Sequence, residues 1–196
     1  AGNGLHVHFS VIDEDGKNIF DDGSERGSEL LQQAVAGCLA AMRASTLVFA
    51  PHSNSYQRIT PGAHAPTGVC WAYENRTSAI RIPSGNHKAR RIEHRVAGGD
   101  VNPYLLLTAI LGAALWGIEN EMSPPAPITG NAYGHAAPQI AQTLKQAITN
   151  FEQSDHIKRL FPALMIDNFS RTKHQENRIL TDLDSKTRSA IYLKAL

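Results

Sequence analysis

The sequence predicts an α+β fold in which antiparallel strands form a sheet that is backed by helices and followed by a helical C-terminal tail. Two observations predict this class. Short segments that alternate around β-branched and aromatic residues, as half-buried strands do, occur in the first hundred residues. Segments with apolar residues at helical spacing lie between them and fill the last third of the chain. With 196 residues, 42% of them hydrophobic, the chain is long enough for one sizeable core.

The first strand and the first long helix follow from these two patterns. Residues 5–12 alternate as a strand, and the turn at 14–17 leads into a short hairpin return at 18–20. Ser28 is expected to cap a helix over residues 29–46, because apolar residues recur there at helical spacing and mark one buried face.

The middle of the chain is predicted to consist of loops and short strands. Residues 50–78 are rich in Pro, Asn, Ser and Gly and read as an ordered loop with brief strands, a kind of segment that often carries function. Strands are expected at 79–83 and 90–96, followed by a core helix from 103 to about 121. The apolar stretch of that helix is too short to cross a bilayer.

The segment 122–135, which contains three prolines and two glycines, is the one credible boundary in the chain. We therefore expect a core at 1–121 with sheet, substrate loops and helices, a connector at 122–135, and a helical part of the same domain at 136–196. Within this last part, apolar stripes predict helices at 138–151, 155–161 and 163–180.

Charge and cysteine content exclude several classes of protein. Nineteen Lys and Arg against 18 Asp and Glu leave a net charge of +1, so neither nucleic acid nor a membrane surface is expected as a partner. Cys38 and Cys70 lack the spacing of a disulfide framework or metal site, which favours two buried thiols and a cytoplasmic protein. The chain starts at Ala1, without a signal peptide, and runs at once into a motif, so we expect a fragment of a larger protein.

The first strand carries a row of polar residues that is suited to metal and phosphate. Side chains of a strand alternate between its faces, so His6, His8 and Ser10 are expected to point the same way. Such a row provides two imidazoles and a hydroxyl. The alternative is one packed and one solvated histidine, because a short motif of this kind often occurs by chance.

The same argument predicts that Arg91, Glu93 and Arg95 share one face of a later strand. An exposed ladder of ion pairs is the ordinary alternative for such a strand. Functionally, Glu93 is a hard oxygen ligand for Mg²⁺ or Mn²⁺, and the arginines offer planar donors to carboxylate or phosphate. Further cationic residues lie within the same 40-residue span, which favours a polyanionic ligand: Arg58, Arg76, Arg81, Lys88 and Arg90. No P-loop, dinucleotide-binding motif or serine nucleophile elbow is present in the sequence.

Five blocks in this order together resemble the glutamine synthetase family, and the resemblance covers residues 1 to about 118. The blocks are Gly-Asn-Gly-Leu-His-Val-His-Phe-Ser at 2–10, Asn-Ser-Tyr-Gln-Arg at 54–58, Pro-Gly-x-x-Ala-Pro at 61–66, Asn-Arg-Thr-Ser-Ala-Ile-Arg-Ile-Pro at 75–83 and Lys-Ala-Arg-Arg-Ile-Glu-His-Arg at 88–95.

The resemblance implies a role for each matching residue. It implies that His6 and Glu93 are metal ligands for Mg²⁺ or Mn²⁺, and that Arg76 has a catalytic role where the phosphoryl group is transferred, touching both ATP and substrate. The remaining ATP contacts would be His8, Ser10, Arg81, Lys88 and Arg91, with Arg81 at the terminal phosphates. The substrate glutamate would contact Gly2, Arg58 and Arg95.

The family's reaction, as the resemblance implies it, is ATP-dependent phosphorylation of the γ-carboxylate of glutamate, followed by attack of ammonia. Members that use ammonia usually carry a Glu in the Pro-Gly-x-Glu-x-Pro loop, where this chain has His64. A neutral imidazole does not attract ammonium as a carboxylate does, although it still accepts a proton. This catalytic position therefore favours the branch that joins glutamate to an amine, similar to γ-glutamylpolyamine or γ-glutamylamide synthetases. The alternative for His64 is a solvated loop residue without a role.

Several interpretations of the sequence remain open at this point. The protein is an amine ligase, a glutamine synthetase that uses ammonia, a non-catalytic structural paralogue, or a small metal-dependent phosphate-binding module. The family resemblance implies further metal ligands upstream, so the fragment alone is expected to be inactive, and a homo-oligomer of stacked rings is expected for the full-length protein. Tyr133 lies about where some bacterial members carry a regulatory tyrosine, but its neighbours match poorly and no regulation is predicted. The remaining histidines are expected to be structural or solvated.

Overall fold

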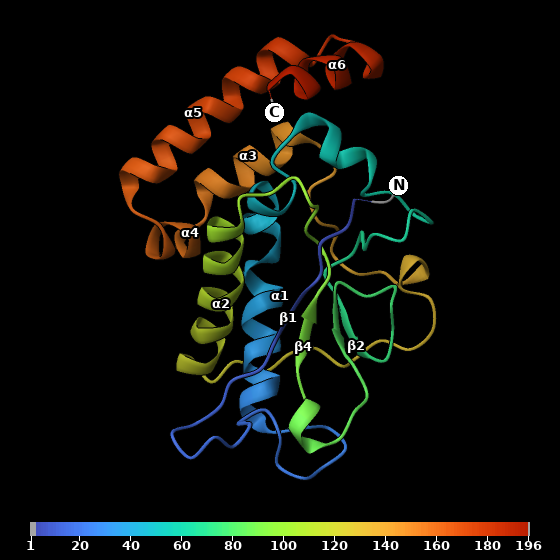
Figure 1. Cartoon of the computed structure of the whole chain (residues 1–196), viewed down its shortest axis with the longest axis vertical. Coiled ribbons are helices and arrows are strands. Elements are labelled where there is room, and N and C mark those ends of the chain that lie inside the picture. Colours follow the sequence, from blue (N-terminus) through green and yellow to red (C-terminus); the bar gives the residue numbers. More distant parts are fainter. Residues whose placement is uncertain (1–2, 196) are drawn as a thin grey trace.

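The computed structural model describes residues 3–195, in which one small sheet lies against a set of helices (Figure 1). Its strands are ordered β1-β4-β3-β2. Each strand has three residues: β1 is Val7–Phe9, β2 is Trp71–Tyr73, β3 is Ile80–Ile82 and β4 is Ile92–His94. The predicted α+β class is confirmed.

The pairing within the sheet is mixed, so the prediction of an antiparallel sheet is wrong for one pair. Strand β4 is antiparallel to both β1 and β3, but β2 and β3 run parallel, with Trp71 opposite Ile80. Parallel neighbours usually need a long crossover. Here each strand has only three residues, so the link over residues 74–79 has to run back along the length of one strand, roughly 10 Å, before β3 begins.

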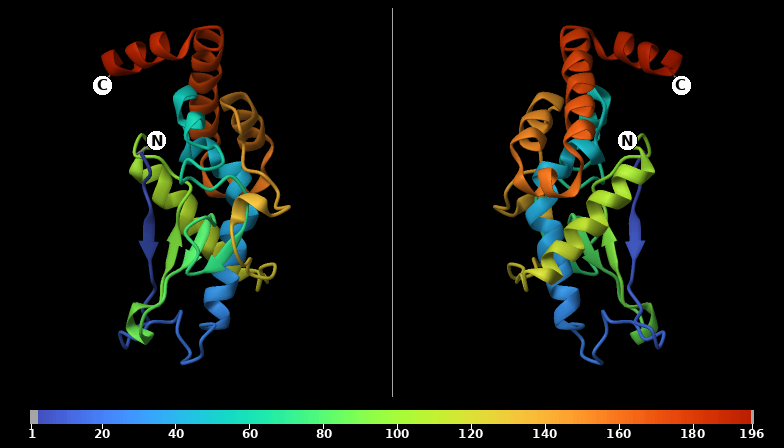
Figure 2. Two further views of the ribbon diagram at one scale, coloured as in Figure 1. Left: turned by 90° about the vertical axis from the view of Figure 1, so that its right-hand side faces the viewer. Right: turned by 90° about the vertical axis from the view of Figure 1, so that its left-hand side faces the viewer.

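Two long helices cover one face of the sheet, α1 (Glu29–Phe49) and α2 (Pro103–Glu119), as Figure 2 shows from both sides. Ile80, Ile82 and Ile92 are buried and belong to the same hydrophobic core as the inner faces of these helices. Because strand side chains alternate, the residues between them point to the opposite face. The opposite face is therefore the one that carries the polar residues singled out in the sequence.

The ends of these helices are set by capping residues and packing. Ser28 caps α1 as predicted, its Oγ accepting a hydrogen bond from the backbone N–H of Leu31 at 3.2 Å. The helix continues three residues beyond the predicted end because its last turn, up to Phe49, is buried in the core. In α2, Asn102 is the cap and Pro103 begins the helix, close to the predicted start.

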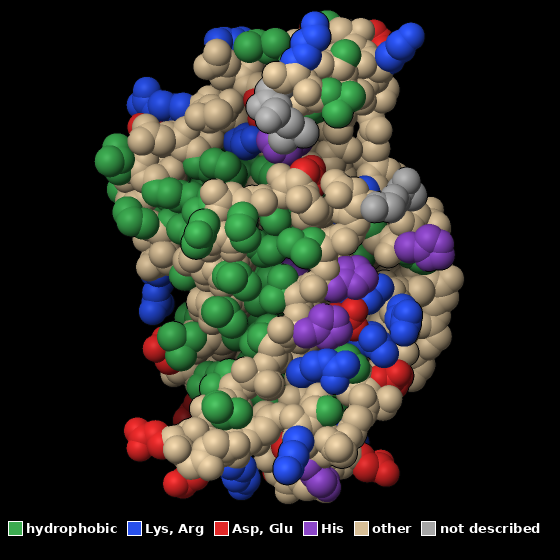
Figure 3. Space-filling view, in the orientation of Figure 1, with side chains coloured by type: hydrophobic (Ala, Val, Ile, Leu, Met, Phe, Trp, Pro, Cys, Tyr) green, Lys and Arg blue, Asp and Glu red, His purple; other side chains and the backbone are tan. Residues whose placement is uncertain are grey.

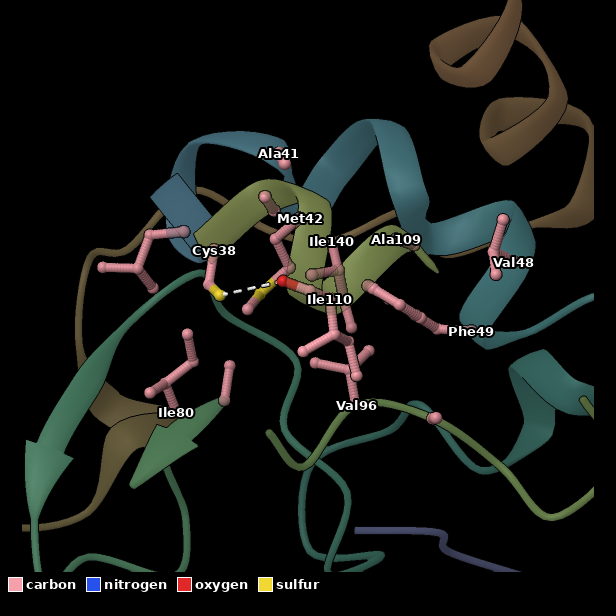
Figure 4. Close-up of a cluster of buried hydrophobic side chains, with 14 of the residues drawn as sticks. Cys38, Ala41, Met42, Val48, Phe49, Ile80, Val96, Ala109, Ile110 and Ile140 are labelled. Carbon is pink, nitrogen blue, oxygen red and sulfur yellow. Dashed lines mark hydrogen bonds between the residues drawn. The ribbon is translucent and has the colours of Figure 1, made fainter. Parts of the chain in front are cut away.

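Helices α1 and α2 approach each other closely at a pair of glycines. A Cβ atom at Gly37 would collide with the carbonyl oxygen of Ala113, and one at Gly117 would collide with backbone of α1. Beside this crossing, the Cys38 thiol lies 3.7 Å from the carbonyl oxygen of Ile110 within the core (Figure 4). Both cysteines are free and buried, as the sequence predicts.

The C-terminal third is helical, as expected, with one difference at its start. Its helices are α3 (Leu144–Gln153), α4 (Asp155–Leu160), α5 (Ala163–Leu180) and α6 (Ser185–Ala195). The helix predicted from 138 begins six residues later, because residues 138–140 run alongside the 67–69 segment, with the backbone N–H of Ile140 bonded to the Thr67 carbonyl at 3.0 Å. Helix α6 was not predicted. The division of the chain at 122–135 stays a prediction.

Three short 3₁₀ helices complete the structure and lie in the loops: η1 (Ser53–Gln57), η2 (His87–Ala89) and η3 (Ala132–Gly134). In the described residues, no helix has the length and apolar character needed to cross a membrane.

Candidate active site

The register of the sheet aligns three of the predicted site residues across neighbouring strands. His8 on β1 lies opposite Glu93 on β4, and Glu93 lies opposite Arg81 on β3. All three occupy the face away from α1 and α2. Figure 3 shows histidine, basic and acidic side chains gathered over β1 and β4, beside the hydrophobic area over α2. The short strands therefore bring a metal-type carboxylate, an imidazole and a guanidinium into one row.

The predicted row on β1 is confirmed for its two histidines. Nδ1 of His6 lies 3.2 Å from Oε1 of Glu93, and Nε2 of His8 lies 3.6 Å from the same oxygen. Burial and the nearby Arg95 hold the pKa of His6 below its usual value. Ser10 is exposed, and no hydrogen bond of its side chain occurs among residues 3–195. Its part in the row stays a prediction.

Glu93 is the centre of the cluster and is held by two guanidinium groups. Oε1 accepts a hydrogen bond from Nη1 of Arg95 at 2.5 Å, and Oε2 accepts one from Nη1 of Arg81 at 2.8 Å. Burial alone would raise the pKa of Glu93, but the hydrogen bonds and charges of both arginines outweigh it and hold the pKa below its usual value. Glu93 therefore stays ionised at neutral pH.

Of the two predicted guanidinium partners of Glu93, Arg95 is found and Arg91 is replaced by Arg81. Arg91 turns toward β1 and donates from Nε to Nδ1 of His8 at 3.2 Å, while Arg81 from the neighbouring strand takes the second position on Glu93. The alternative of an exposed ion-pair ladder is wrong, because the side chains of Glu93 and Arg95 are 3% and 6% exposed. Charged groups buried to this extent are rare unless they are paired.

Cationic groups outnumber carboxylates around this cluster. Arg81 also pairs with Glu74 at 3.1 Å. The two carboxylates, Glu74 and Glu93, therefore lie among three guanidinium groups, those of Arg81, Arg91 and Arg95. Arg58 is 8% exposed, and Nη2 donates to the carbonyl oxygen of Val96 at 2.5 Å. The charge of Asp100 acts on Arg58, but among the described residues no carboxylate lies within salt-bridge distance of its guanidinium. Burial lowers the pKa of its guanidinium. A buried arginine of this kind is suited to an anionic ligand.

Two further predicted residues lie on loops, and within the described part of the chain one is bonded to the cluster and the other is not. Arg76 is exposed, and its carbonyl oxygen accepts a hydrogen bond from Nη2 of Arg95 at 2.7 Å, so its loop is tied to β4. Lys88 lies on η2 and lines a hollow of about 490 Å³ together with Lys17 and His87. Gly2 lies outside the described residues, so its predicted contact with glutamate is not described.

His64 lies on an exposed loop and has a left-handed backbone conformation, with φ of 59°. Such a φ is uncommon for a residue other than glycine. In the part of the chain that the structure describes, its side chain makes no hydrogen bond or ion pair. Its catalytic role stays a prediction.

Two of the predicted metal ligands, His6 and Glu93, lie together on this face. The imidazole of His6 and the carboxylate of Glu93 supply one nitrogen and up to two oxygens, a set that suits Mn²⁺ or Mg²⁺. Within residues 3–195, no cluster of three or more His, Cys, Asp or Glu side chains that could hold a metal ion is found. The two residues fit a metal as part of a site that needs further ligands.

The sequence analysis assigned no role in the site to two residues near the cluster. Glu74 follows β2 in a turn with φ of 52°, and it binds both Arg81 and the backbone of Ser84. The hydroxyl of Tyr133 donates to the carbonyl oxygen of Ala65, next to His64, at 2.9 Å. No periodic pattern marks either residue, because Glu74 lies in a turn and Tyr133 lies on the short 3₁₀ helix η3.

The remaining histidines lie in structural or surface positions, as predicted. His94 faces the core and packs against Phe49 with ring centres 4.7 Å apart, and burial lowers its pKa to about 3. The others contact nearby side chains or backbone: His52 with Glu176, His87 with Asp21, His135 with the Thr129 carbonyl, His156 with Trp116 and His174 with Glu152.

Comparison with known proteins identifies the family. Residues 1–190 match the family model described as glutamine synthetase, catalytic domain. The chain belongs to the glutamine synthetase family. It is 38% identical over 184 residues to the γ-glutamylethanolamide synthetase of Streptomyces coelicolor and 34% identical over 188 residues to the γ-glutamylputrescine synthetase of Escherichia coli, with 94% of the chain covered in each case. It is also 34% identical over 195 residues, 91% of the chain, to the glutamine synthetase of Sulfolobus acidocaldarius.

A solved structure agrees with the family assignment. The structure described as a GmaS/ADP complex matches with a TM-score of 0.83 and 29% identity, and covers 96% of this chain and 46% of that one. The chain spans 38% to 41% of the length of the three relatives named above. The family and the fold predicted from the sequence are thereby confirmed.

Proposed function

We propose that the full-length protein is an ATP-dependent ligase that phosphorylates the γ-carboxylate of glutamate and joins it to an amine. One observation carries this proposal: an ionised, buried Glu93 is surrounded by a surplus of cationic groups on the open face of the sheet. Such a surplus suits triphosphate and carboxylate oxygens, which need several positive charges for neutralisation. The family membership supports the same reaction.

The predicted residues have proposed roles in this reaction. His6 and Glu93 are the proposed metal ligands, and a bound Mg²⁺ or Mn²⁺ would supply charge neutralisation at the phosphates. His8, Ser10, Lys88 and Arg91 would lie along ATP, and Arg81 would meet its terminal phosphates. Gly2, Arg58 and Arg95 would hold glutamate. Further metal ligands would come from parts of the protein outside this chain, and we propose a homo-oligomer for the whole enzyme.

Arg58, Arg95 and Arg76 have distinct tasks in the proposed reaction. Arg58 and Arg95 would orient the glutamate carboxylates through guanidinium groups that the fold already holds in place, so little freedom is lost on binding. Arg76, on the exposed loop tied to Arg95, would neutralise charge on the acyl phosphate as the phosphoryl group moves from ATP to glutamate. Attack of the amine nitrogen on the activated carbonyl carbon then forms the amide and releases phosphate.

The amine acceptor is favoured over ammonia by His64 and by the relatives. An imidazole in the 61–66 loop accepts a proton from an incoming amine without the charge that attracts ammonium. Two of the relatives described above act, by their names, on ethanolamine or putrescine. Ammonia remains the second candidate, because glutamine synthetases are also among the relatives, at 34% identity.

Phosphate release by the full-length protein tests both candidates. The protein is incubated with ATP, Mg²⁺ and glutamate, in parallel with ammonium and with putrescine, spermidine, ethanolamine and monoalkylamines. We expect release with at least one amine and little with ammonium, and loss of release on chelation of the metal. A clear preference for ammonium would contradict the amine proposal, and silence with every acceptor would favour a non-catalytic paralogue.

A further inference from the structure

We infer that Tyr133 is a positioning residue for the loop that carries His64, and that it thereby controls binding of the acceptor amine. The inference rests on the proposed function and adds a residue to it. The Tyr133 hydroxyl donates a hydrogen bond to the carbonyl oxygen of Ala65 at 2.9 Å. Ala65 is buried and directly follows His64, so this contact lies at the base of the exposed tip of the loop.

The tip of this loop has few restraints of its own. Among the described residues, its backbone is held by the Ala63 N–H, which bonds to the Thr60 carbonyl at 3.1 Å, and then by Thr67, whose carbonyl accepts from Ile140. Within residues 60–67 the chain adopts positive φ at Gly62 and His64. A left-handed histidine persists where the surroundings hold it in place, and the Tyr133 hydroxyl provides such a contact.

Tyr133 lies on η3, and hydrogen bonds hold this segment against the loop that carries Arg76. The backbone N–H of Ala132 donates to Oγ1 of Thr77 at 2.9 Å, and Nδ2 of Asn75 donates to the Gly130 carbonyl at 2.6 Å. These bonds fasten η3 and the preceding Gly130 to the two neighbours of Arg76. Tyr133 therefore links the loop of the proposed acceptor residue to the loop of the proposed phosphoryl-transfer residue.

This linkage has a consequence for the acceptor step. The amine has to reach the acyl phosphate while the base lies within hydrogen-bond reach of its proton. If the Ala65 carbonyl is released, the His64 loop samples other positions, and the acceptor site is formed for a smaller fraction of the time. The apparent affinity for the amine falls in proportion to that fraction, whereas glutamate and ATP, whose proposed contacts lie outside residues 61–66, bind as before.

The substitution Tyr133→Phe in the full-length protein tests the inference, because it removes the hydroxyl and keeps the ring. We expect the KM for the amine to rise roughly 3- to 10-fold, the effect of one lost hydrogen bond, with the KM values for glutamate and ATP unchanged. Backbone amide exchange in residues 61–66 should become faster, while exchange in the sheet stays the same. Tyr104→Phe is the matched control, since Tyr104 is 80% exposed and its hydroxyl makes no hydrogen bond within residues 3–195.

Two results would overturn the inference. One is an unchanged amine KM with unchanged exchange in residues 61–66. The other is a parallel loss in all three KM values and in thermal stability, which indicates a general structural role. If the wild-type protein releases no phosphate with any acceptor, the proposed function fails, and the exchange measurement alone then decides whether Tyr133 positions the loop.

Discussion

Two glutamates with low exposure, the buried Glu93 on β4 and the partly buried Glu176 on α5, have different surroundings. Both are held below their usual pKa by partners that outweigh the effect of burial. Glu93 is bound by two arginines on the open face of the sheet. Glu176, 14% exposed, pairs with Lys173 at 2.7 Å and accepts a hydrogen bond from the Tyr192 hydroxyl at 2.5 Å.

The two sites differ in the balance of charge around the carboxylate. Around Glu176, one cation and several neutral donors balance one carboxylate, and the backbone N–H of Ser53 bonds to both Glu176 and Tyr192. These hydrogen bonds join α5 and α6 to η1. Around Glu93, two guanidinium groups share one carboxylate, and Arg91 lies beside them on His8. A balanced charge therefore joins elements of the fold, whereas the excess of positive charge around Glu93 supports the proposed ligand site.

The largest expected effect is the loss of activity on Glu93→Gln. The amide keeps the shape of the side chain but removes the charge that would bind a metal and orient two arginines. We expect phosphate release to fall roughly 100-fold or more, measured with ATP, Mg²⁺, glutamate and the best amine. The melting temperature serves as a control for folding. Activity within a few-fold of wild type in a folded variant would contradict the role of Glu93.

The matching change at the other cluster, Glu176→Gln, should act on stability. The folded pKa of Glu176 is about 2, below its ordinary value of 4.5, so its stabilising contribution is complete above pH 4.5 and is lost as the pH falls toward 2. The variant should be less stable than wild type at pH 7, by at most about 3 kcal/mol. Urea unfolding at several pH values measures the difference.

A control variant separates this effect from the loss of any surface charge. Glu152 on α3 is a partly exposed partner of His174. Glu152→Gln should change the free energy of unfolding by less than about 1 kcal/mol. A Glu176→Gln difference that stays constant from pH 7 to pH 2 would contradict the account, because the stabilisation would not come from the ionised carboxylate.

A smaller effect is expected from Arg58→Lys. Lysine keeps the charge but loses the planar set of donors that suits a carboxylate. We expect the KM for glutamate to rise about 10-fold, with the KM for ATP unchanged, as initial rates at varied substrate will measure. Arg171→Lys on the exposed side of α5 is the control and should alter neither value. Equal changes in both KM values would argue against a glutamate contact at Arg58.

The sequence predicted which side chains share a strand face better than it predicted the strand pairing. Alternation within a strand fixes the face of a side chain, which is why His6 and His8 lie on one face and both approach Glu93. Alternation does not fix which strand lies alongside. The second guanidinium on Glu93 therefore came from Arg81 on β3, as the register dictates.

The missed elements share a cause in contacts that leave no periodic pattern. Helix α6 docks on η1 through polar side chains, with Asn54 Nδ2 donating to Ser189 Oγ at 3.2 Å and Gln57 Nε2 donating to Ser185 Oγ at 3.0 Å. Such a helix lacks the apolar stripe on which sequence reasoning relies. The parallel pairing of β2 and β3 was missed for a similar reason, because it depends on the shortness of the strands.

The most direct test of the account is whether phosphate release from ATP depends on glutamate. The full-length protein is assayed with ATP, Mg²⁺ and an amine, with and without glutamate, and the initial rates are compared. If the face around Glu93 belongs to a glutamate ligase, release requires glutamate and follows its concentration to saturation. Release at the same rate without glutamate would contradict the central claim.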